Sequence, residues 1–176
     1  MERIVVQSFI YPALHTLPPN LTVADQYAFR PTGSTTAALI YLLHTITKFH
    51  VDNPYVVVIG LDFSKAFDTV RHKTLLEKLA CLDLPDCVYN WLVDYFSGHS
   101  RCTGYRGHIS AIENITASIV QGSAIGPVSY VINAADLLPI TPGNCKYADD
   151  TYLIIPANNV DTRMAEINNI ETVPIT

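Results

Sequence analysis

Two adjacent carboxylates, Asp149 and Asp150, lie in the stretch KYADDTYLIIP, between residues that alternate as they do in β-strands. Successive side chains of a strand point to opposite faces, so both can serve one site only if the chain turns here. Carboxylates about 4 Å apart repel each other by about 1 kcal/mol in water and about 4 kcal/mol at an intermediate dielectric. A divalent cation would cancel that repulsion. A solvated turn is the simpler interpretation, although Asn-Gly or Asp-Gly is the more usual turn chemistry.

A third carboxylate, Asp62, ends the nearly continuous apolar run YVVVIGL, which is typical of a strand covered on both faces. A charge at the end of such a strand is costly unless it is paired or bound to a metal ion. The alternative is that Asp62 caps the turn that follows it. Asp68, close to Arg71 and His72, is interpreted as a surface or capping residue.

Together the three aspartates predict a site for two Mg²⁺ ions. Mg²⁺ prefers oxygen ligands and usually takes one or two carboxylates plus substrate phosphates. Two such ions about 3.5–4 Å apart can clamp the attacking and leaving oxygens of a phosphoryl transfer. Polymerases, nucleases and phosphatases all use this arrangement, so the acids alone leave these classes open.

The elements that must position these groups follow from hydrophobic periodicity and turn residues. A long helix is expected after the N-cap Ser34, ending near HVDNP. Further helices are expected at 72–82, 85–96, 128–138 and 158–171. Strands are expected at 55–63, 100–107, 111–120, 145–147 and 151–156, with hairpins around Gly107–His108 and around the acidic pair. This pattern predicts an α+β fold with a mostly antiparallel sheet backed by helices.

The composition bounds the class of protein. The chain has 176 residues, 49% hydrophobic and 15% charged, as expected for one globular domain. It has neither an uninterrupted run of eighteen apolar residues nor a signal-peptide pattern, so we expect an intracellular, non-membrane protein. Four cysteines without C-x-x-C spacing predict reduced, packed thiols and no zinc. The net charge of −5 argues against a large nucleic-acid footprint.

Several ordered motifs choose among the open classes. The stretches LDFSKAFDTV, QGSAIGP and YADD resemble, in this order and at these separations, the three palm motifs of reverse transcriptases of non-LTR retrotransposons. QYAFRPTGSTTAAL and MERIVVQSFIYPAL resemble the preceding blocks of that family. The resemblance implies a polymerase palm with a partial fingers region. Its expected boundaries are fingers at 1–50, palm with the carboxylates at 51–156, and the start of a truncated palm helix at 157–176, with the thumb absent.

The resemblance also implies the metal ligands and the reaction. Asp62 and Asp149 would be the principal Mg²⁺ ligands, with Asp150 beside them and the Phe63 carbonyl as a further oxygen; Mn²⁺ is an alternative ion. A primer 3′-hydroxyl would attack the α-phosphate of a dNTP, and pyrophosphate would leave. One ion would lower the pKa of the hydroxyl and the other would neutralise the leaving phosphates. The implied partners are an RNA template, a DNA primer and dNTPs.

Further residues acquire substrate-binding roles from the same resemblance. Phe67 would pack beneath the incoming sugar and exclude a 2′-hydroxyl, unless it only fills the core. Arg30 would support the template path, with a structural salt bridge as the alternative. The other residues implied in substrate binding are Lys65 and Ala66 at the triphosphate, Gln121 and Gly122 at the nucleotide, and Tyr147 and Ala148 near the primer end.

Departures from the family pattern keep other interpretations open. An upstream basic segment and the thumb are expected to be missing, which would account for the acidic balance, and Ala28 stands where relatives often have Gly. One alternative is therefore a catalytically inactive retroelement remnant that retains the palm fold. A haloacid dehalogenase-like phosphatase would need an acid at Ser64 and a parallel sheet. A non-catalytic RNA-binding module would need a basic surface and stacking aromatics.

Overall fold

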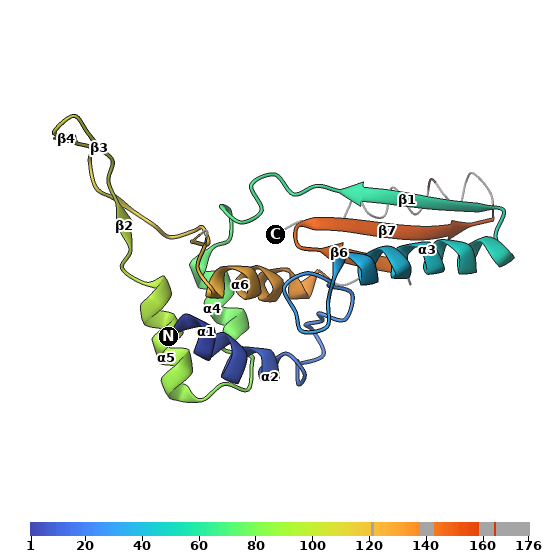
Figure 1. Ribbon diagram of the computed structural model, residues 1–176, viewed down its shortest axis with the longest axis horizontal. Helices are drawn as coiled ribbons and strands as arrows, with labels where there is room; N and C mark the ends of the chain where they lie inside the picture. Colours follow the sequence, from blue (N-terminus) through green and yellow to red (C-terminus); the bar gives the residue numbers. More distant parts are fainter. Residues whose placement is uncertain (121, 138–142, 159–163, 165–176) are drawn as a thin grey trace. The chain divides into compact units, whose positions relative to one another are not determined.

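A computed structural model describes residues 1–120, 122–137, 143–158 and 164 of the chain (Figure 1). The contacts divide the chain into two compact units, which we describe separately. The first consists of Met1–Val23 and Lys65–Asp136, and the second of Ala24–Ser64 and Leu137–Thr176. Both units combine helices with antiparallel strands, which confirms the predicted α+β class.

The second unit contains a three-stranded sheet in the order β1-β7-β6, antiparallel throughout. Its strands are β1 (Tyr55–Leu61), β6 (Gly143–Tyr147) and β7 (Asp150–Ala157). The central strand β7 pairs with the whole of β1 on one side and with β6 on the other. Its residues Leu153, Ile154 and Ile155 are buried. The strands and the hairpin predicted around the acidic pair are therefore confirmed.

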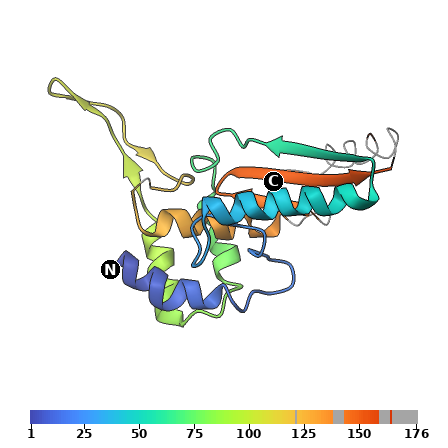
Figure 2. The same cartoon turned by 45° about the vertical axis from the view of Figure 1, so that its right-hand side comes forward.

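Helix α3 (Thr35–Asp52) runs along one face of this sheet (Figures 1 and 2). It begins, as predicted, after Ser34, whose hydroxyl accepts a hydrogen bond from the Ala37 N–H at 3.1 Å. It ends before Asn53 and Pro54, because a residue that precedes proline is disfavoured in the helical conformation. The helix thus supports the sheet from the predicted position.

The prediction that 55–63 forms a strand covered on both faces is wrong, although a strand, β1, is present over Tyr55–Leu61. None of its residues is buried, and Tyr55 and Val58 are 46% and 42% exposed. The reason is the strand order: β1 lies at an edge of the sheet, where its side chains have a neighbouring strand on one side only. A continuous β-branched run indicates a strand, but it does not reveal whether the strand is central.

Short helices dominate the first unit. The N-terminal segment consists of α1 (Glu2–Val5), a π-helical turn (Val6–Ile10) and α2 (Tyr11–Ala13). The later part of the unit contains α4 (His72–Leu79), α5 (Asp86–Phe96), α6 (Ile125–Asn133) and the 3₁₀ turn Ala134–Asp136. Helix α6 is almost entirely buried. Three helices were predicted here, and all are present with shifted ends. The helix predicted at 158–171 lies outside the described residues, apart from 158 and 164.

His72 links three parts of the first unit. Its Nδ1 lies 2.9 Å from the Phe96 carbonyl oxygen, and its Nε2 lies 2.7 Å from the Ser118 carbonyl oxygen. The ring is buried, so both nitrogens find partners within the protein. His72 therefore joins the start of α4 to the end of α5 and to the segment before α6. Asp68 is exposed, in agreement with its predicted surface position.

A narrow ribbon replaces the two longer strands predicted at 100–107 and 111–120 (Figure 1). It consists of two short antiparallel ladders, β2 (Ser100–Arg101) with β5 (Glu113–Asn114) and β3 (Gly104–Tyr105) with β4 (His108–Ile109). The hairpin is confirmed, but its turn is formed by Arg106 and Gly107, both at positive φ, and His108 belongs to β4. Two left-handed residues in succession are the signature of a type I′ turn.

The four cysteines are unpaired, but only Cys145 is packed as predicted. Cys81, Cys87 and Cys102 are exposed, so the expectation of buried thiols is wrong for them. Cys145 lies on β6 beneath α3, and its Sγ is 3.8 Å from the Ala38 carbonyl oxygen. Burial, followed by the nearby Asp25 carboxylate, raises the pKa of the Cys145 thiol to about 11. Within the described residues, no helix is long and apolar enough to cross a membrane.

This contrast predicts selective thiol chemistry. Near neutral pH, a maleimide should modify Cys81, Cys87 and Cys102 in the folded chain and Cys145 only after unfolding, because the thiolate is the reactive form. Peptide mass spectrometry of native and denatured samples measures this. The pKa of the Cys145 thiol is 9.0 in the unfolded chain and about 11 in the folded one. Between these pH values the unfolded chain loses the proton first, so the free energy of unfolding should fall as the pH rises from 9.0 to about 11. Native labelling of Cys145 at the rate of the other three would contradict the packing.

Candidate active site

The register of the sheet brings two of the predicted acids to one end of it. Leu61, the last residue of β1, is paired with Thr151 of β7. Asp62 follows Leu61 and Asp150 precedes Thr151, so one further step along the same register would place the two acids opposite each other. Asp149 is next to Asp150 in the turn. The three carboxylate-bearing residues therefore share one end of the second unit's sheet.

The acidic pair occupies the β6–β7 hairpin. Tyr147 pairs with Asp150, which leaves Ala148 and Asp149 as a two-residue connection. Ala148 has φ +56° and Asp149 does not have a positive φ, the pattern of a type II′ turn, in which the first position usually belongs to glycine. The predicted turn is confirmed, with a strained residue immediately before Asp149, but it lifts only Asp149 out of the pleat, because Asp150 is already the first residue of β7.

The donor groups at this end of the sheet suit a hard divalent cation. Asp62 and Asp150 are exposed and Asp149 is half-buried, so carboxylate oxygens are accessible. Among the described residues, however, no group of three or more His, Cys, Asp or Glu side chains is arranged to hold a metal ion. The acids thus share an end of the sheet and have the right chemistry, without forming a converged ligand cluster. Phe63, whose carbonyl was predicted as a further ligand, lies in the connection after β1.

Two predicted substrate residues flank the acids in the same hairpin. Tyr147 ends β6, and its hydroxyl accepts a hydrogen bond from the Thr35 hydroxyl at 2.8 Å, at the start of α3. Ala148 forms the first turn position. Arg30 belongs to the same unit, and its Nη1 donates to the backbone carbonyls of Ala24 and Gln26, each at 3.2 Å. Arg30 therefore stabilises the local backbone.

Other predicted substrate residues belong to the first unit. Phe67 is half-buried, and its ring stacks on Tyr130 of α6 with centroids 4.5 Å apart. Ala66 is buried, and Lys65 has φ +56° in the turn after the strand. Gly122 has φ +85°, a conformation that side chains disfavour, so glycine suits this position on backbone grounds. Gln121 lies outside the described residues.

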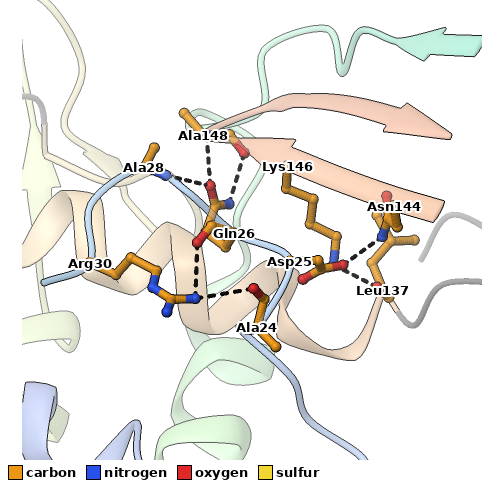
Figure 3. Close-up of polar contacts among 9 residues, drawn as sticks. All are labelled: Ala24, Asp25, Gln26, Ala28, Arg30, Leu137, Asn144, Lys146 and Ala148. Atoms are coloured by element: carbon orange, nitrogen blue, oxygen red, sulfur yellow. Dashed lines mark hydrogen bonds and ion pairs between the residues drawn. The ribbon is translucent and has the colours of Figure 1, made fainter. Parts of the chain in front are cut away.

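A buried charge network underlies the hairpin and was not anticipated from the sequence (Figure 3). Lys146 of β6 is 2% exposed, and its Nζ lies 3.2 Å from Asp25 Oδ2 and donates to the Leu137 carbonyl oxygen at 2.6 Å. The Asn144 amide also donates to Asp25 Oδ2, at 2.6 Å. The sequence did contain one indication of this network, which is a lysine within a predicted hairpin strand. If that strand is covered, the lysine side chain is buried and needs a carboxylate or carbonyl partner.

The segment that carries Asp25 also pairs with β6 through its backbone. The Lys146 N–H donates to the Asp25 carbonyl and the Tyr27 N–H donates to the Lys146 carbonyl, both at 2.8 Å. These bonds form a short parallel bridge between Gln26 and Lys146. Gln26 is 2% exposed, and its side chain bonds to the backbone of Ala148 in the turn (Figure 3). Gln26 is a second residue that the sequence interpretation missed.

The arrangement of these motifs agrees with a known family. Residues 4–171 match the reverse transcriptase (RNA-dependent DNA polymerase) family. The chain belongs to this family. The match covers both structural units, and it confirms the resemblance drawn from the palm motifs.

Individual relatives come from mobile elements of Drosophila melanogaster. The RNA-directed DNA polymerase from mobile element jockey is 28% identical over 144 residues, covering 77% of this chain and 16% of the relative. The probable enzyme from transposon BS is 29% identical over 142 residues, covering 76% of this chain and 16% of the relative. The probable RNA-directed DNA polymerase from transposon X-element is 28% identical over 118 residues, covering 67% of this chain and 13% of the relative. The chain thus spans a small part of the length of these relatives.

The buried ion pair gives a stability prediction. Asp25→Ala should destabilise the second unit by about 3–5 kcal/mol, because it leaves the Lys146 ammonium buried without its carboxylate. Urea unfolding followed by the fluorescence of the unit's tyrosines measures this. As a control, Glu77→Ala breaks the exposed Lys73–Glu77 pair at 3.9 Å and should change stability by at most about 0.5 kcal/mol. Equal effects of the two variants would show that the buried pair has no special role.

Proposed function

We propose that this chain forms the catalytic core of an RNA-directed DNA polymerase. It would extend a primer 3′-hydroxyl with dNTPs opposite an RNA template. The observation that supports this most directly is the β1–β7 register, because it brings Asp62 to the end of the sheet that carries Asp149 and Asp150 in a member of this family. Polymerase chemistry needs few protein groups beyond such acids, since catalysis rests on positioning and charge neutralisation.

In this proposal the sheet of β1, β6 and β7 is the floor of a polymerase palm. The palm would span 51–156, residues 1–50 would supply part of the fingers, and 157–176 would begin a further palm helix. The support is the motif order together with the antiparallel sheet that carries the acids. The protein would work inside the cell, where its template, primer and dNTPs are found.

Asp62 and Asp149 would hold two Mg²⁺ or Mn²⁺ ions, with Asp150 beside them and the Phe63 carbonyl as a further oxygen ligand. When bound, the ions would lower the pKa of the attacking hydroxyl and neutralise the leaving pyrophosphate. The carboxylates would fix the ions at the sheet end. Support comes from the oxygen-rich donor set and the accessibility of Asp62 and Asp150.

Further residues would contact the incoming nucleotide and the template. Phe67 would form a wall beneath the sugar, and its stacking on Tyr130 would keep the ring rigid. Gly122 would allow close approach to the nucleotide. The remaining proposed contacts are the Lys65 and Ala66 amides at the triphosphate, Gln121 at the sugar, Tyr147 and Ala148 near the primer end, and Arg30 along the template path.

Primer extension tests the proposal. The chain, with Mg²⁺, dNTPs and a DNA primer on an RNA template, should lengthen the primer, and Asp149→Asn should reduce the rate at least about a hundredfold through loss of charge stabilisation. Asp94→Asn, the same change at an exposed position on α5, should leave the rate unchanged. Absence of Mg²⁺-dependent extension by the wild-type chain would instead support an inactive remnant with the palm fold.

Sugar selection gives an independent test at Phe67. Phe67→Ala should raise incorporation of rNTPs relative to dNTPs by about ten- to a hundredfold, because it removes the wall against a 2′-hydroxyl. Phe67→Tyr retains the ring and should keep the wild-type ratio. Single-nucleotide kinetics with each substrate provide the measurement. An unchanged ratio in Phe67→Ala, accompanied by lower stability, would assign Phe67 to core packing alone.

A further inference from the structure

The Gln26 side chain satisfies both backbone groups of one turn residue (Figure 3). Its Nε2 donates to the Ala148 carbonyl oxygen at 3.2 Å, and its Oε1 accepts from the Ala148 N–H at 3.0 Å. The same Oε1 accepts from the Ala28 N–H at 3.0 Å. A buried amide has few partners to choose from, and this one uses both of its ends on Ala148.

Ala148 needs such support because of its backbone conformation. At φ +56° an L-residue other than glycine is strained by about 1–2 kcal/mol. Hydrogen bonds to both its N–H and its C=O oppose a rotation of the flanking peptide planes that would relieve this strain. Asp149 follows directly, so the dihedral angles of Ala148 decide the direction in which the Asp149 carboxylate points.

The position of Gln26 is itself fixed. The backbone bonds from Lys146 to Asp25 and from Tyr27 to Lys146 hold Gln26 beside β6, two residues before the turn. The buried Asp25–Lys146 pair on the same segment opposes sliding of this register. The Gln26 amide is therefore presented to Ala148 by contacts that do not involve the turn.

We propose that Gln26 is a positioning residue, which holds Ala148 at its positive φ and thereby aims the Asp149 carboxylate at the divalent ion. Gln26 contacts neither ion nor substrate in this role. Its effect on DNA synthesis rests on the proposed function, whereas its effect on the turn does not.

The test compares variants that separate the conformation of the turn from general stability. Gln26→Met keeps a side chain of similar volume but leaves both Ala148 groups without their partner. Ala148→Gly removes the strain, since glycine adopts positive φ freely. Asn144→Ala is the matched control, because it deletes another buried amide of the same unit that bonds to Asp25 and not to the turn.

Two readouts are independent of polymerase activity. The ¹³C chemical shifts of Ala148 report its backbone conformation, and Mn²⁺ binding, followed by electron paramagnetic resonance, reports the ion site. Gln26→Met should move the Ala148 shifts away from the values of a positive-φ residue and weaken Mn²⁺ binding about tenfold. Asn144→Ala should change neither. Adding Ala148→Gly to Gln26→Met should restore most of the Mn²⁺ affinity.

The outcomes distinguish this proposal from the proposed function. Unchanged Ala148 shifts in Gln26→Met would overturn the positioning role, whatever the activity. It would also be overturned if Asn144→Ala weakened Mn²⁺ binding equally, or if Ala148→Gly gave no rescue. A wild-type chain that binds Mn²⁺ and shows these effects, but does not extend a primer, would support the positioning role and contradict the polymerase.

Discussion

Side chains alternate along a strand, so the pairing of β1 with β7 determines which chemical groups meet at each end of the sheet. A register shift of one residue would turn every side chain of β7 to the other face, so Leu153, Ile154 and Ile155, which are all buried, would lose their present packing partners. The same pairing brings the end of β1 to the start of β7, where the aspartates lie. The register of β1 and β7 therefore determines both the burial of the sheet and the location of the acids.

That constraint is reinforced from the outer side of β6. The segment around Gln26 pairs with β6 in parallel, and Lys146 forms its buried ion pair with the same segment. A buried pair adds little to stability compared with apolar packing, but breaking it is expensive, so it specifies one arrangement over its neighbours. In this unit the polar interior specifies the register, and the apolar face of β7 together with α3 supplies the burial.

The negative net charge of the chain is unexpected for a member of the reverse transcriptase family. A net charge of −5 is unusual for a surface that grips nucleic acid. The chain matches 13% to 16% of the length of the relatives described above, so most of their surface is not represented in it. Charge alone would have argued against polynucleotide chemistry, whereas the ordered motifs argue for it. The motifs carry more weight because they specify residues at defined separations.

The sequence by itself determined the local elements and the family. The Ser34 cap, the apolar run before Asp62 and the alternation around Asp149 each act over a few residues, so they could be interpreted without knowledge of distant partners. Strand order, the exposure of β1, the burial of Lys146 and the role of Gln26 were decided only by the tertiary structure. Each of these depends on contacts between segments far apart in the chain, such as Gln26 with Ala148, and no local pattern encodes such a pairing.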